Sequence, residues 1–442
     1  MSAPAVSFKE NLQHIRLNDE FVRAFEAIDN SVDHLFVTGK AGTGKSTLLQ
    51  YFRLKTTKKM VVLAPTGVAA INIQGQTIHS FFRFRPDITP DIVEEIYVSK
   101  QKARFYKKLE AIVIDEISMV RADLMDCVDA FLRLYGKNPH KPFGGVQMIF
   151  FGDLYQLPPV VREEDREIFR TVYSTPYFLG AKVFKEATFR TIELQEIYRQ
   201  TDTRFVDLLN AVRHNQASDN DLKLLNSRVQ PAVSGGEEFT VTLTTTNAQA
   251  DEINRLRLKE LSSGGVQFQG AVSGEFSKKI LPNQETLEFK VGAQVMFLTN
   301  DIQKRWVNGT IGKVTALVPQ DDGKTIIMVK LANGQEVDVK IFTWEIYQYE
   351  FDRELQTFMA NPVGYFTQYP LKRAWAVTIH KAQGLTFDRV AIDVGRGAFA
   401  HGQIYVALSR CRSLEGITLR RPISARDIVC DRQMMAFFQT VQ

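Results

Sequence analysis

The sequence predicts an α/β fold with two parallel-sheet units. The first observation is a series of short apolar runs that read as buried strands and alternate with segments suited to helices; the runs cover residues 34–38, 60–64, 111–114 and 146–151. The second is that this alternation begins again near residue 185, with strand candidates at 191–194, 239–243, 375–379 and 390–394. We therefore expect a first unit over residues 1–184 and a second over residues 185–289 and 371–442.

The composition agrees with a globular protein of more than one domain. The chain has 442 residues, which exceeds what one hydrophobic core usually supports, and 44% of them are hydrophobic and 24% charged. The formal net charge of +5 permits a local basic groove but does not by itself indicate nucleic acid. A nucleic-acid function must therefore be argued from motifs.

The cysteines and the N-terminal segment bear on the cellular compartment. Cys127, Cys411 and Cys430 are widely spaced and form no CxxC or Cys/His ligand cluster, which indicates a reducing compartment and no structural zinc. The N-terminal segment lacks the apolar stretch of a signal peptide, and no run approaches the roughly 18 apolar residues that a membrane span needs. We expect a soluble protein that is not secreted.

A phosphate-binding loop is the clearest chemical motif. The strand candidate Leu35–Val37 leads into GKAGTGKS, residues 39–46, and then into a run suited to a helix. The glycines let successive backbone N–H groups turn toward phosphate oxygens, the helix adds its positive N-terminus, and Lys45 adds a point charge. Ser46 can then hold Mg²⁺. A flexible glycine-rich connector is the alternative, but the strand before the loop and the helix after it argue against one.

Hydrolysis of a bound nucleotide also needs a metal ligand and a group that activates water. Asp115 and Glu116 follow directly after a strand candidate, and we predict that Asp115 holds Mg²⁺ while Glu116 orients or deprotonates the attacking water. Gln156, just past the strand candidate 146–151, is a candidate for sensing the γ-phosphate through its amide. Standing alone, these residues would read as solvated loop residues; the P-loop upstream favours the catalytic interpretation.

Arg199 and Arg410 are candidates for the guanidinium groups that meet the charge developing in phosphoryl transfer. Such groups raise the rate by about 10³- to 10⁵-fold where measured. Both arginines fall in the predicted second unit. If ATP lies between two units, arginines from the far side couple hydrolysis to closure of the cleft, although either one taken alone reads as a surface arginine.

Two segments interrupt the α/β alternation. Residues 81–108 contain two prolines, clustered aromatic residues and a basic end, which predicts an insertion that projects from the first sheet. Residues 290–348 contain short β-rich runs separated by Asn308-Gly309, Asp322-Gly323 and Asn333-Gly334, which are strong hairpin signals. We expect the second segment to form a small antiparallel barrel inserted in the second unit.

The series of motifs resembles that of the petite-integration-frequency (Pif) DNA helicases, in the branch of superfamily one that moves 5′ to 3′. The motifs that carry the resemblance span residues 39–412 in a specific order: GKAGTGKS (39–46), APTGVAA (64–70), TIHSFF (77–82), VIDEISM (113–119), KPFGGVQMIFFGDLYQLPPV (141–160), IYRQ (197–200), WVNGTIG (306–312), TIHKAQGLTFD (378–388) and GQIYVALSRCR (402–412). The stretch around PFGGVQ resembles the signature that separates this family from its RecD-like and Dda-like relatives.

The resemblance implies two RecA-like domains with ATP and Mg²⁺ between them. It also implies a small wedge inserted in the first domain, near residues 82–108, and an SH3-like barrel inserted in the second, near residues 290–370. Residues implied to contact nucleotide are Gly42, Thr43, Gly44, Lys45, Ser46, Thr47, Gln383 and Gly384; those implied to act in hydrolysis are Lys45, Glu116, Gln156, Arg199 and Arg410, with Ser46 and Asp115 on the metal.

Single-stranded DNA is implied to lie across both RecA-like domains. The motif matches assign the contacts to Pro65, Thr66, Gly67, His79, Thr246, Asn247, His380 and Lys381. Backbone and hydroxyl contacts to phosphate suit stepping that is independent of base sequence. The structural alternatives are that Thr66 is a helix cap and that His79 and His380 are satisfied internal histidines.

One motif departs from the family. Superfamily-one helicases usually carry a glutamine ahead of the P-loop that reads adenine, but here Leu17–Glu20 is followed by Phe21-Val22, and no glutamine occurs between Gln13 and the P-loop. Base selectivity is therefore left open, and use of other nucleoside triphosphates is an alternative.

We expect an ATP-dependent helicase that moves 5′ to 3′ on single-stranded DNA and unwinds duplex or folded DNA. By family resemblance it would serve replication, DNA repair, recombination or telomere maintenance, as a monomer acting on single-stranded, forked or structured DNA. Its location would be the cytoplasm and nucleoid of a bacterium, or the nucleus or mitochondria of a eukaryote. Two other classes stay open: a DNA-stimulated translocase that remodels complexes without unwinding, and a nucleotide switch or scaffold without useful catalysis.

Overall fold

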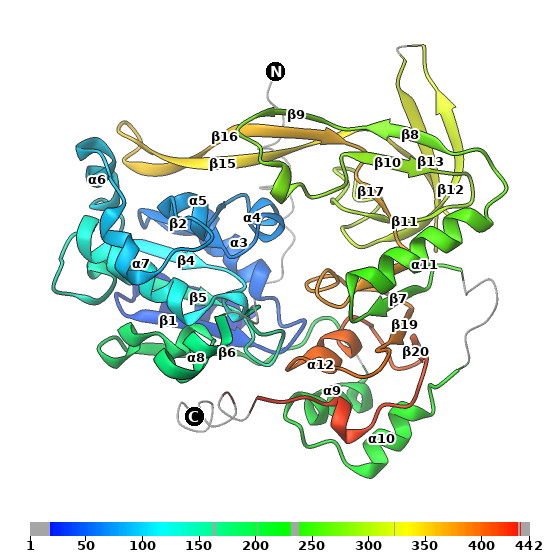
Figure 1. The fold of residues 1–442 in the computed structure, drawn as a ribbon, viewed down its shortest axis with the longest axis horizontal. Helices are drawn as coiled ribbons and strands as arrows, with labels where there is room; N and C mark the ends of the chain where they lie inside the picture. Colours follow the sequence, from blue (N-terminus) through cyan, green and yellow to red (C-terminus); the bar gives the residue numbers. More distant parts are fainter. Residues whose placement is uncertain are drawn as a thin grey trace.

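The computed structural model describes residues 18–161, 165–200, 202–230, 238–321, 323–431 and 434. Two α/β lobes lie side by side, and a β-rich region next to the second lobe sends a long hairpin over the first (Figure 1). Within the described residues, no helix combines the length and apolar character required to cross a membrane.

The first lobe is built on a six-stranded sheet with the strand order β3-β2-β4-β5-β1-β6. All of its neighbouring strands pair in parallel. The strands are β1 (His34–Gly39), β2 (Met60–Ala64), β3 (Gln76–Thr77), β4 (Ala111–Ile114), β5 (Gln147–Phe151) and β6 (Phe189–Leu194). Every residue of β2, β4 and β5 is buried, as expected for parallel strands covered on both faces.

Each face of this sheet carries its own apolar core. Because side chains alternate along a strand, Phe36 of β1 packs in one cluster while its neighbours Leu35 and Val37 pack in the other. The covering helices are α2 (Asp19–Asn30), α3 (Lys45–Lys55), α4 (Gly67–Asn72), α5 (Ile78–Phe82), α7 (Ala122–Tyr135) and α8 (Arg166–Val172), with 3-10 turns η2 (Ile117–Met119), η3 (Pro142–Gly145), η5 (Phe178–Gly180) and η6 (Lys182–Lys185). The four strands predicted in the first unit are therefore confirmed.

The predicted boundary at residue 185 is wrong. Residues Phe189–Leu194 form β6, which pairs in parallel with β1 along its whole length, from His34–Phe189 to Gly39–Leu194. The first lobe therefore extends through residue 194. An edge strand of this kind looks like the first strand of a new unit in the sequence, because the sequence does not show which strand it pairs with.

The second lobe is built on a four-stranded parallel sheet with the order β18-β7-β19-β20. Its elements are α9 (Thr203–Arg213), α10 (Asp219–Asn226), β7 (Val241–Thr244), α11 (Asn247–Glu260), β18 (Ala376–Thr378), β19 (Val390–Asp393), α12 (Gln403–Leu408), β20 (Ile417–Leu419) and η8 (Ala425–Asp427). The predicted strands near 239–243, 375–379 and 390–394 are thus present, and the fold has the expected two RecA-like lobes.

The aromatic residues of the first inserted segment lie inside the first lobe. The segment contains η1 (Pro90–Glu95) and α6 (Lys100–Tyr106), and its rings Phe81, Phe82, Phe84, Phe105 and Tyr106 all belong to the core below it. The large apolar side chains that it exposes are Tyr97 and Ile92. The sequence predicts that this segment projects from the sheet; its aromatic rings pack into the core of the first lobe, where Phe82 and Tyr106 contact Phe131 of α7.

The β-rich region occupies the chain between α11 and β18. Its main sheet is antiparallel, with the order β14-β13-β12-β11-β17. The strands are β11 (Gln294–Phe297), β12 (Ile311–Pro319), β13 (Thr325–Leu331), β14 (Glu336–Val339) and β17 (Leu371–Arg373). The glycines of the three predicted turns all take positive φ angles: 94° at Gly309, between β11 and β12, and 76° at Gly323 and 88° at Gly334, in the two turns that follow.

The inserted region begins earlier than predicted. The strands β8 (Val266–Gln269), β9 (Ala271–Gly274) and β10 (Thr286–Phe289) precede residue 290, and η7 (Lys278–Ile280) lies between them. They pair with each other or with β16, and with none of the parallel strands of the second lobe. The sequence prediction places residues 261–289 in the second lobe because β8 and β9 are largely exposed, so that their sequences lack the alternation that marks a strand.

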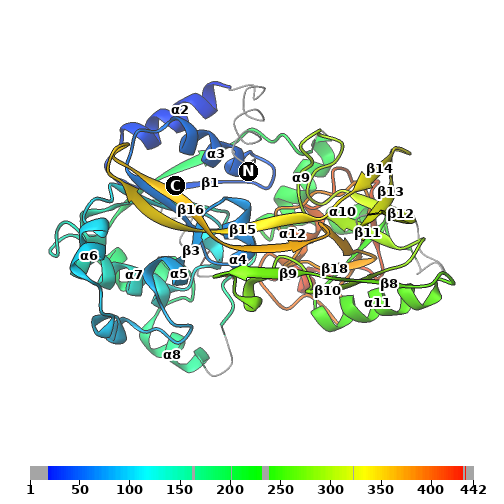
Figure 2. The ribbon, with the colours of Figure 1, turned by 90° about the horizontal axis from the view of Figure 1, so that it is seen from above.

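A long hairpin links the β-rich region to the first lobe. The strands β15 (Phe342–Asp352) and β16 (Thr357–Gln368) run across the first lobe, as both ribbon views show (Figures 1 and 2). The Tyr349 hydroxyl accepts a hydrogen bond from the Val62 N–H at 3.0 Å, and the Gln76 Oε1 accepts one from the Tyr349 N–H at 3.1 Å. The Phe358 ring lies 4.7 Å from that of Phe105. The hairpin therefore shares the core of the first lobe.

The Tyr349 hydroxyl contact yields a prediction. A buried N–H without a partner costs about 1–3 kcal/mol, so Tyr349→Phe should increase hydrogen exchange of the β2 amides roughly tenfold or more while leaving the ring packing intact. Hydrogen–deuterium exchange measured on peptides that cover residues 60–64 checks this. Tyr365→Phe, at a 36% exposed position of the same hairpin, is the control, and equal exchange in both variants would contradict the assigned role.

Candidate nucleotide site between the lobes

The P-loop lies between β1 and α3. Strand β1 ends at Gly39, and α3 begins at Lys45 after Gly44, which takes a left-handed conformation with φ of 82°. The Lys45 ammonium folds back over the loop and donates to the carbonyl oxygens of Gly39, at 2.7 Å, and Lys40, at 3.0 Å. Burial lowers the pKa of Lys45, against the carboxylates of Asp153 and Glu116, which raise it. The strand, the glycine loop and the helix thus follow one another as the sequence motif predicts, and Lys45 is held on the loop by two of its carbonyl oxygens.

The acidic pair follows β4 and faces the P-loop lysine. The Glu116 N–H donates to Asp115 Oδ1 at 2.9 Å, and Glu116 itself has a positive φ of 51°. Burial and then the neighbouring Glu116 carboxylate raise the pKa of Asp115 to about 7. Burial also raises the pKa of Glu116, against Lys45 and Arg410, which lower it. A carboxylate whose pKa is raised is a stronger base, which suits the activation of water.

Gln156 and Gln383 bring the two lobes together at Glu116. Gln156 lies after β5 in the first lobe, and Gln383 lies after β18 in the second. The Gln383 Nε2 donates to Glu116 Oε2 at 3.1 Å and to Gln156 Oε1 at 3.3 Å. Gly384 follows with a positive φ of 80°. Three of the predicted residues therefore form one hydrogen-bonded group that requires both lobes.

The predicted arginines approach the loop from different directions. Arg199 lies directly over the P-loop, since a Cβ added at Gly42 would be 2.5 Å from the Arg199 Cβ. Its guanidinium donates to the carbonyl oxygens of Ser409, at 3.2 Å, and Gly384, at 3.5 Å. Because β6 belongs to the first lobe, Arg199 lies in the segment that joins the lobes, and its assignment to the second α/β unit is wrong.

Arg410 comes from the second lobe and is 1% exposed. Its guanidinium donates to the Val406 carbonyl at 2.9 Å and the Ser409 hydroxyl at 2.8 Å. Burial and then Arg199 lower its pKa to about 9, whereas the Glu116 carboxylate raises it. Because burial and a neighbouring cation both disfavour the charged form of Arg410, its guanidinium would be stabilised by binding an anion.

The donors predicted to hold Mg²⁺ fit a hard cation. Ser46, the second residue of α3, presents a hydroxyl, and Asp115 presents a carboxylate with a raised pKa; oxygen is the ligand that Mg²⁺ prefers. Over the ranges that the structure describes, no group of three or more His, Cys, Asp or Glu side chains could hold a metal. Mg²⁺ is ordinarily bound by one or two protein ligands together with phosphate oxygens and water, which agrees with this small donor set.

The threonines predicted to contact DNA both cap helices. Thr66 follows β2 and accepts from the Ala69 N–H at 3.3 Å, so the structural alternative for this residue is confirmed; Thr246 follows β7 and accepts from the Gln249 N–H at 3.3 Å. Beside them, Pro65 follows β2 directly, Gly67 is the first residue of α4, and Asn247 is the first residue of α11. A Cβ at Gly67 would be 2.7 Å from the Ile280 Cβ, so the β-rich region packs on this turn.

The remaining predicted DNA contacts lie in or beside short helical turns. His79 lies in α5, and His380 and Lys381 follow β18. Burial lowers the pKa of both histidines, which favours the neutral imidazole, and a neutral imidazole can still hydrogen-bond to a phosphate. Lys381 is exposed and can supply charge. All eight residues follow strands of the two sheets at their carboxyl ends, which is where open α/β sheets bind ligands.

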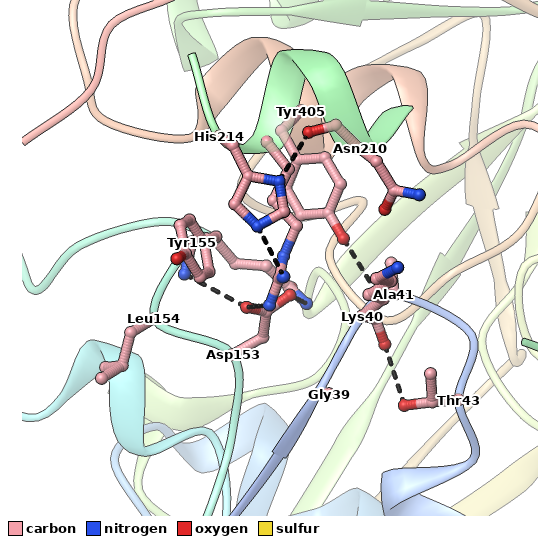
Figure 3. Close-up of polar contacts among 12 residues, drawn as sticks. Gly39, Lys40, Ala41, Thr43, Asp153, Leu154, Tyr155, Asn210, His214 and Tyr405 are labelled. Atoms are coloured by element: carbon pink, nitrogen blue, oxygen red, sulfur yellow. Dashed lines mark hydrogen bonds and ion pairs between the residues drawn. The ribbon is translucent and has the colours of Figure 1, made fainter. Parts of the chain in front are cut away.

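Sequence reasoning missed a second set of residues behind the P-loop (Figure 3). The Tyr405 hydroxyl of α12 accepts from the Ala41 N–H of the P-loop at 3.0 Å. Asp153 of the first lobe forms an ion pair with Arg213 of the second at 3.0 Å. The sequence held one signal for them, since Asp153 and Tyr405 lie within the GDLYQ and IYVALSR motifs, but it did not show that they meet the other lobe.

Comparison with known proteins identifies the family. A family model described as PIF1-like helicase matches residues 16–223, and a second model described as helicase matches residues 358–432. The ATP-dependent DNA helicase Pif1 of Bdellovibrio bacteriovorus is 33% identical over 438 residues, which cover 97% of this chain and 93% of that protein. The chain belongs to the PIF1-like helicase family.

Solved structures of PIF1-like helicases agree with the fold. Pif1 from Bacteroides sp in complex with ADP-AlF4 has 37% sequence identity and a TM-score of 0.88, covering 96% of this chain and 97% of that one. Pif1 from Bacteroides in complex with ADP-AlF3 and ssDNA has 38% identity and a TM-score of 0.68, with the same coverage of each chain. The resemblance inferred from the motifs is confirmed.

Gly42 provides a test of how tightly the P-loop is enclosed. Its φ of 87° and the Arg199 Cβ, 2.5 Å from an added Cβ, both oppose a side chain. Gly42→Ala should therefore lower the affinity for nucleotide by about tenfold or more. Gly334→Ala is a matched control, because Gly334 has a φ of 88° but no atom within 4 Å of an added Cβ. Titration with a fluorescent ADP analogue measures both; unchanged affinity in Gly42→Ala would show that the loop is more open than described.

Proposed function

We propose that this chain is an ATP-dependent DNA helicase that moves 5′ to 3′ along single-stranded DNA and unwinds duplex or folded DNA. The observation that carries the proposal is that Glu116 and Gln156 of the first lobe share hydrogen bonds with Gln383 of the second. A site assembled in this way changes whenever the lobes move relative to each other. Nucleotide turnover is thereby coupled to a motion that displaces one lobe along a bound strand.

The residues divide the work of hydrolysis. Gly42, Thr43, Gly44 and Thr47 surround the phosphates with backbone and hydroxyl groups, and Lys45 neutralises phosphate charge. Ser46 and Asp115 would hold Mg²⁺, which supplies charge to the phosphate oxygens when bound. Glu116 orients and deprotonates the attacking water, with the Gln156 amide beside it. Arg199 and Arg410 stabilise the charge that develops on the transferred group.

Single-stranded DNA would lie along the carboxyl ends of both sheets. The proposed DNA contacts on the first lobe are Pro65, Thr66, Gly67 and His79, and those on the second lobe are Thr246, Asn247, His380 and Lys381. Contacts of this type reach phosphates and do not read bases, so the strand can slip by one step when the lobes close and reopen. Support comes from the PIF1-like relatives, one of which has been solved with ssDNA.

The broader roles of the chain belong to the same proposal. We place it in genome maintenance, as a monomer on single-stranded, forked or structured DNA, in the compartment that holds the cell's DNA. The rival classes, a translocase that does not unwind and a nucleotide switch, are outcomes of the experiments below. The unwinding assay decides between a helicase and a translocase.

A forked-duplex assay tests the proposed function. The wild-type chain should separate a fork that has a 5′ single-stranded tail, and not one with only a 3′ tail, in the presence of ATP and Mg²⁺. Lys45→Ala and Glu116→Gln should each reduce DNA-stimulated phosphate release to about 1% or less of wild type, because each removes a group that acts in the transition state, while DNA binding is retained. ATP turnover without strand separation would favour the translocase, and no DNA-stimulated turnover would favour the switch.

The two arginines are tested separately. Arg199→Ala and Arg410→Ala should each lower kcat by about 10³-fold or more with a smaller change in the KM for ATP, because a guanidinium on the transferring phosphoryl group acts mainly in the transition state. Arg133→Ala, which removes the ion pairs with Asp129 and Glu186 at the end of α7, is the control and should keep wild-type kcat. A change confined to KM would show that the arginines only bind nucleotide.

A further inference from the structure

A buried ion pair joins the two lobes behind the nucleotide site. Arg213, the last residue of α9, donates from Nη2 to Asp153 Oδ1 at 3.0 Å, and the two side chains are 3% and 0% exposed. Asp153 follows β5 of the first lobe, whereas α9 packs in the core of the second lobe through Phe205 and Leu208. The pair is therefore a contact between lobes that is closed to solvent.

Three groups hold the Arg213 guanidinium in place. In addition to Asp153, its central carbon lies 3.9 Å from the centroid of the Tyr155 ring, and its Nη1 lies 3.5 Å from His214 Nε2. The His214 Nδ1 lies 2.8 Å from the Asn210 carbonyl oxygen, to which it must donate, so the Nε2 of the neutral ring is the acceptor that faces Arg213 (Figure 3). The Asp153 carboxylate, the face of the Tyr155 ring and the His214 imidazole thus fix both the position and the plane of the guanidinium.

Asp153 in turn fixes the orientation of the Gln156 amide. Its Oδ2 accepts from Gln156 Nε2 at 3.2 Å, and its Oδ1 accepts from the Tyr155 N–H at 3.1 Å. An ionised carboxylate can only accept hydrogen bonds, so the amide must turn its nitrogen toward Asp153. The Gln156 Oε1 is then left to face Gln383, which donates to it at 3.3 Å.

The second lobe also contacts the backbone of the segment between Asp153 and Gln156. The His401 Nε2 lies 3.0 Å from the Leu154 carbonyl oxygen and donates to it, while His401 Nδ1 accepts from the Asp431 N–H at 2.9 Å. At Gly402 an added Cβ would be 2.2 Å from the Tyr155 carbonyl oxygen. Contacts from the second lobe therefore fix the loop that carries Gln156, both through the loop backbone and through the Asp153 carboxylate.

The charge state of Asp153 depends on the pairing. Burial by itself would raise the pKa of Asp153, but the Arg213 guanidinium and the Lys45 ammonium more than offset burial and hold that pKa below its usual value. If Arg213 were replaced by a neutral side chain, the buried carboxyl group would bind a proton more readily. A protonated carboxyl group can donate, so the Gln156 amide would no longer have one preferred orientation.

We propose that Arg213 is a positioning residue for ATP hydrolysis: through Asp153 it fixes the orientation of the Gln156 amide beside Glu116. Because Arg213 belongs to the second lobe, the catalytic group is correctly arranged only when the lobes are docked. This inference rests on the proposed function, in which Gln156 faces the γ-phosphate and the attacking water. It adds a structural route by which closure of the lobes switches hydrolysis on.

A double-mutant cycle tests the proposal. DNA-stimulated phosphate release is measured for Arg213→Met, Arg213→Lys and Asp153→Asn, each in the wild-type chain and in Gln156→Ala. Arg213→Met should lower kcat by about tenfold or more while the KM for ATP changes by less than about threefold. Arg213→Lys should recover part of the loss, since it retains the charge. In Gln156→Ala, Arg213→Met should lower kcat by less than about twofold, because the side chain that it positions is absent.

If the double variant Arg213→Met/Gln156→Ala loses kcat by the product of the two single-variant losses, the proposal is overturned, because Arg213 then acts independently of Gln156. Arg421→Met is the matched control: it breaks the Arg421–Asp427 pair within the second lobe, whose side chains are 32% and 8% exposed, and should keep kcat within about twofold of wild type. An equal loss of kcat in this control would also overturn the proposal, since breaking any partly buried ion pair would then suffice.

The cycle does not depend on one variant. If Arg213→Met does not fold, Asp153→Asn replaces it in the cycle with Gln156→Ala, since this change preserves the side-chain shape. A loss of kcat that disappears in Gln156→Ala supports the proposal, and losses that multiply overturn it. A wild-type chain without ATPase activity would overturn the proposed function together with this inference. An active wild-type chain whose kcat is unaffected by Arg213→Met would overturn this inference alone.

Discussion

Compensation of buried charge at the junction of the lobes is the constraint on which the rest of the structure depends. Asp153, Arg213 and Arg410 are buried there, and half-buried Lys45 and Glu116 lie beside them. Removing a charge from water costs several kcal/mol unless a partner of opposite sign is placed beside it. For Asp153 the directly paired partner, Arg213, comes from the other lobe, so this ion pair forms only when the two lobes are docked. The nucleotide site is the place where this requirement and the catalytic chemistry coincide.

The β-rich region acts on the same junction from outside. Its hairpin contributes Tyr349 and Phe358 to the core of the first lobe, although the chain enters and leaves the hairpin through β14 and β17 of the β-rich sheet. Ile280 of the same region packs on Gly67, at the turn where the DNA strand is expected. Movement of the lobes therefore has to carry this region with it or to break these contacts. The insertion therefore contacts the first lobe as well as the second lobe, into which it is inserted.

Local chemistry was readable from the sequence, and pairing between distant segments was not. The P-loop, Asp115-Glu116 and the hairpin turns were predicted because each depends on residues close together in the chain. The boundary at 185 failed because β6 is defined by pairing with β1, more than 100 residues away. Likewise, β8 and β9 escaped notice because exposed strands lack alternation. The aromatic residues of 81–108 were recognised as a cluster, but only packing shows that they point inward.

By itself the sequence predicted a phosphate-binding loop after β1, placed acids and a glutamine after β4 and β5, and carried the motif series of a PIF1-like helicase. These motifs could be recognised because each is made of residues close together in the chain. A glycine loop, the end of a strand and the start of a helix determine locally which polar groups are free to bind a ligand. The tertiary structure alone decided that Gln383 reaches Glu116 and that Arg213 neutralises Asp153. Such contacts join residues of separate lobes, and only the docking of two folded surfaces brings them within hydrogen-bonding distance.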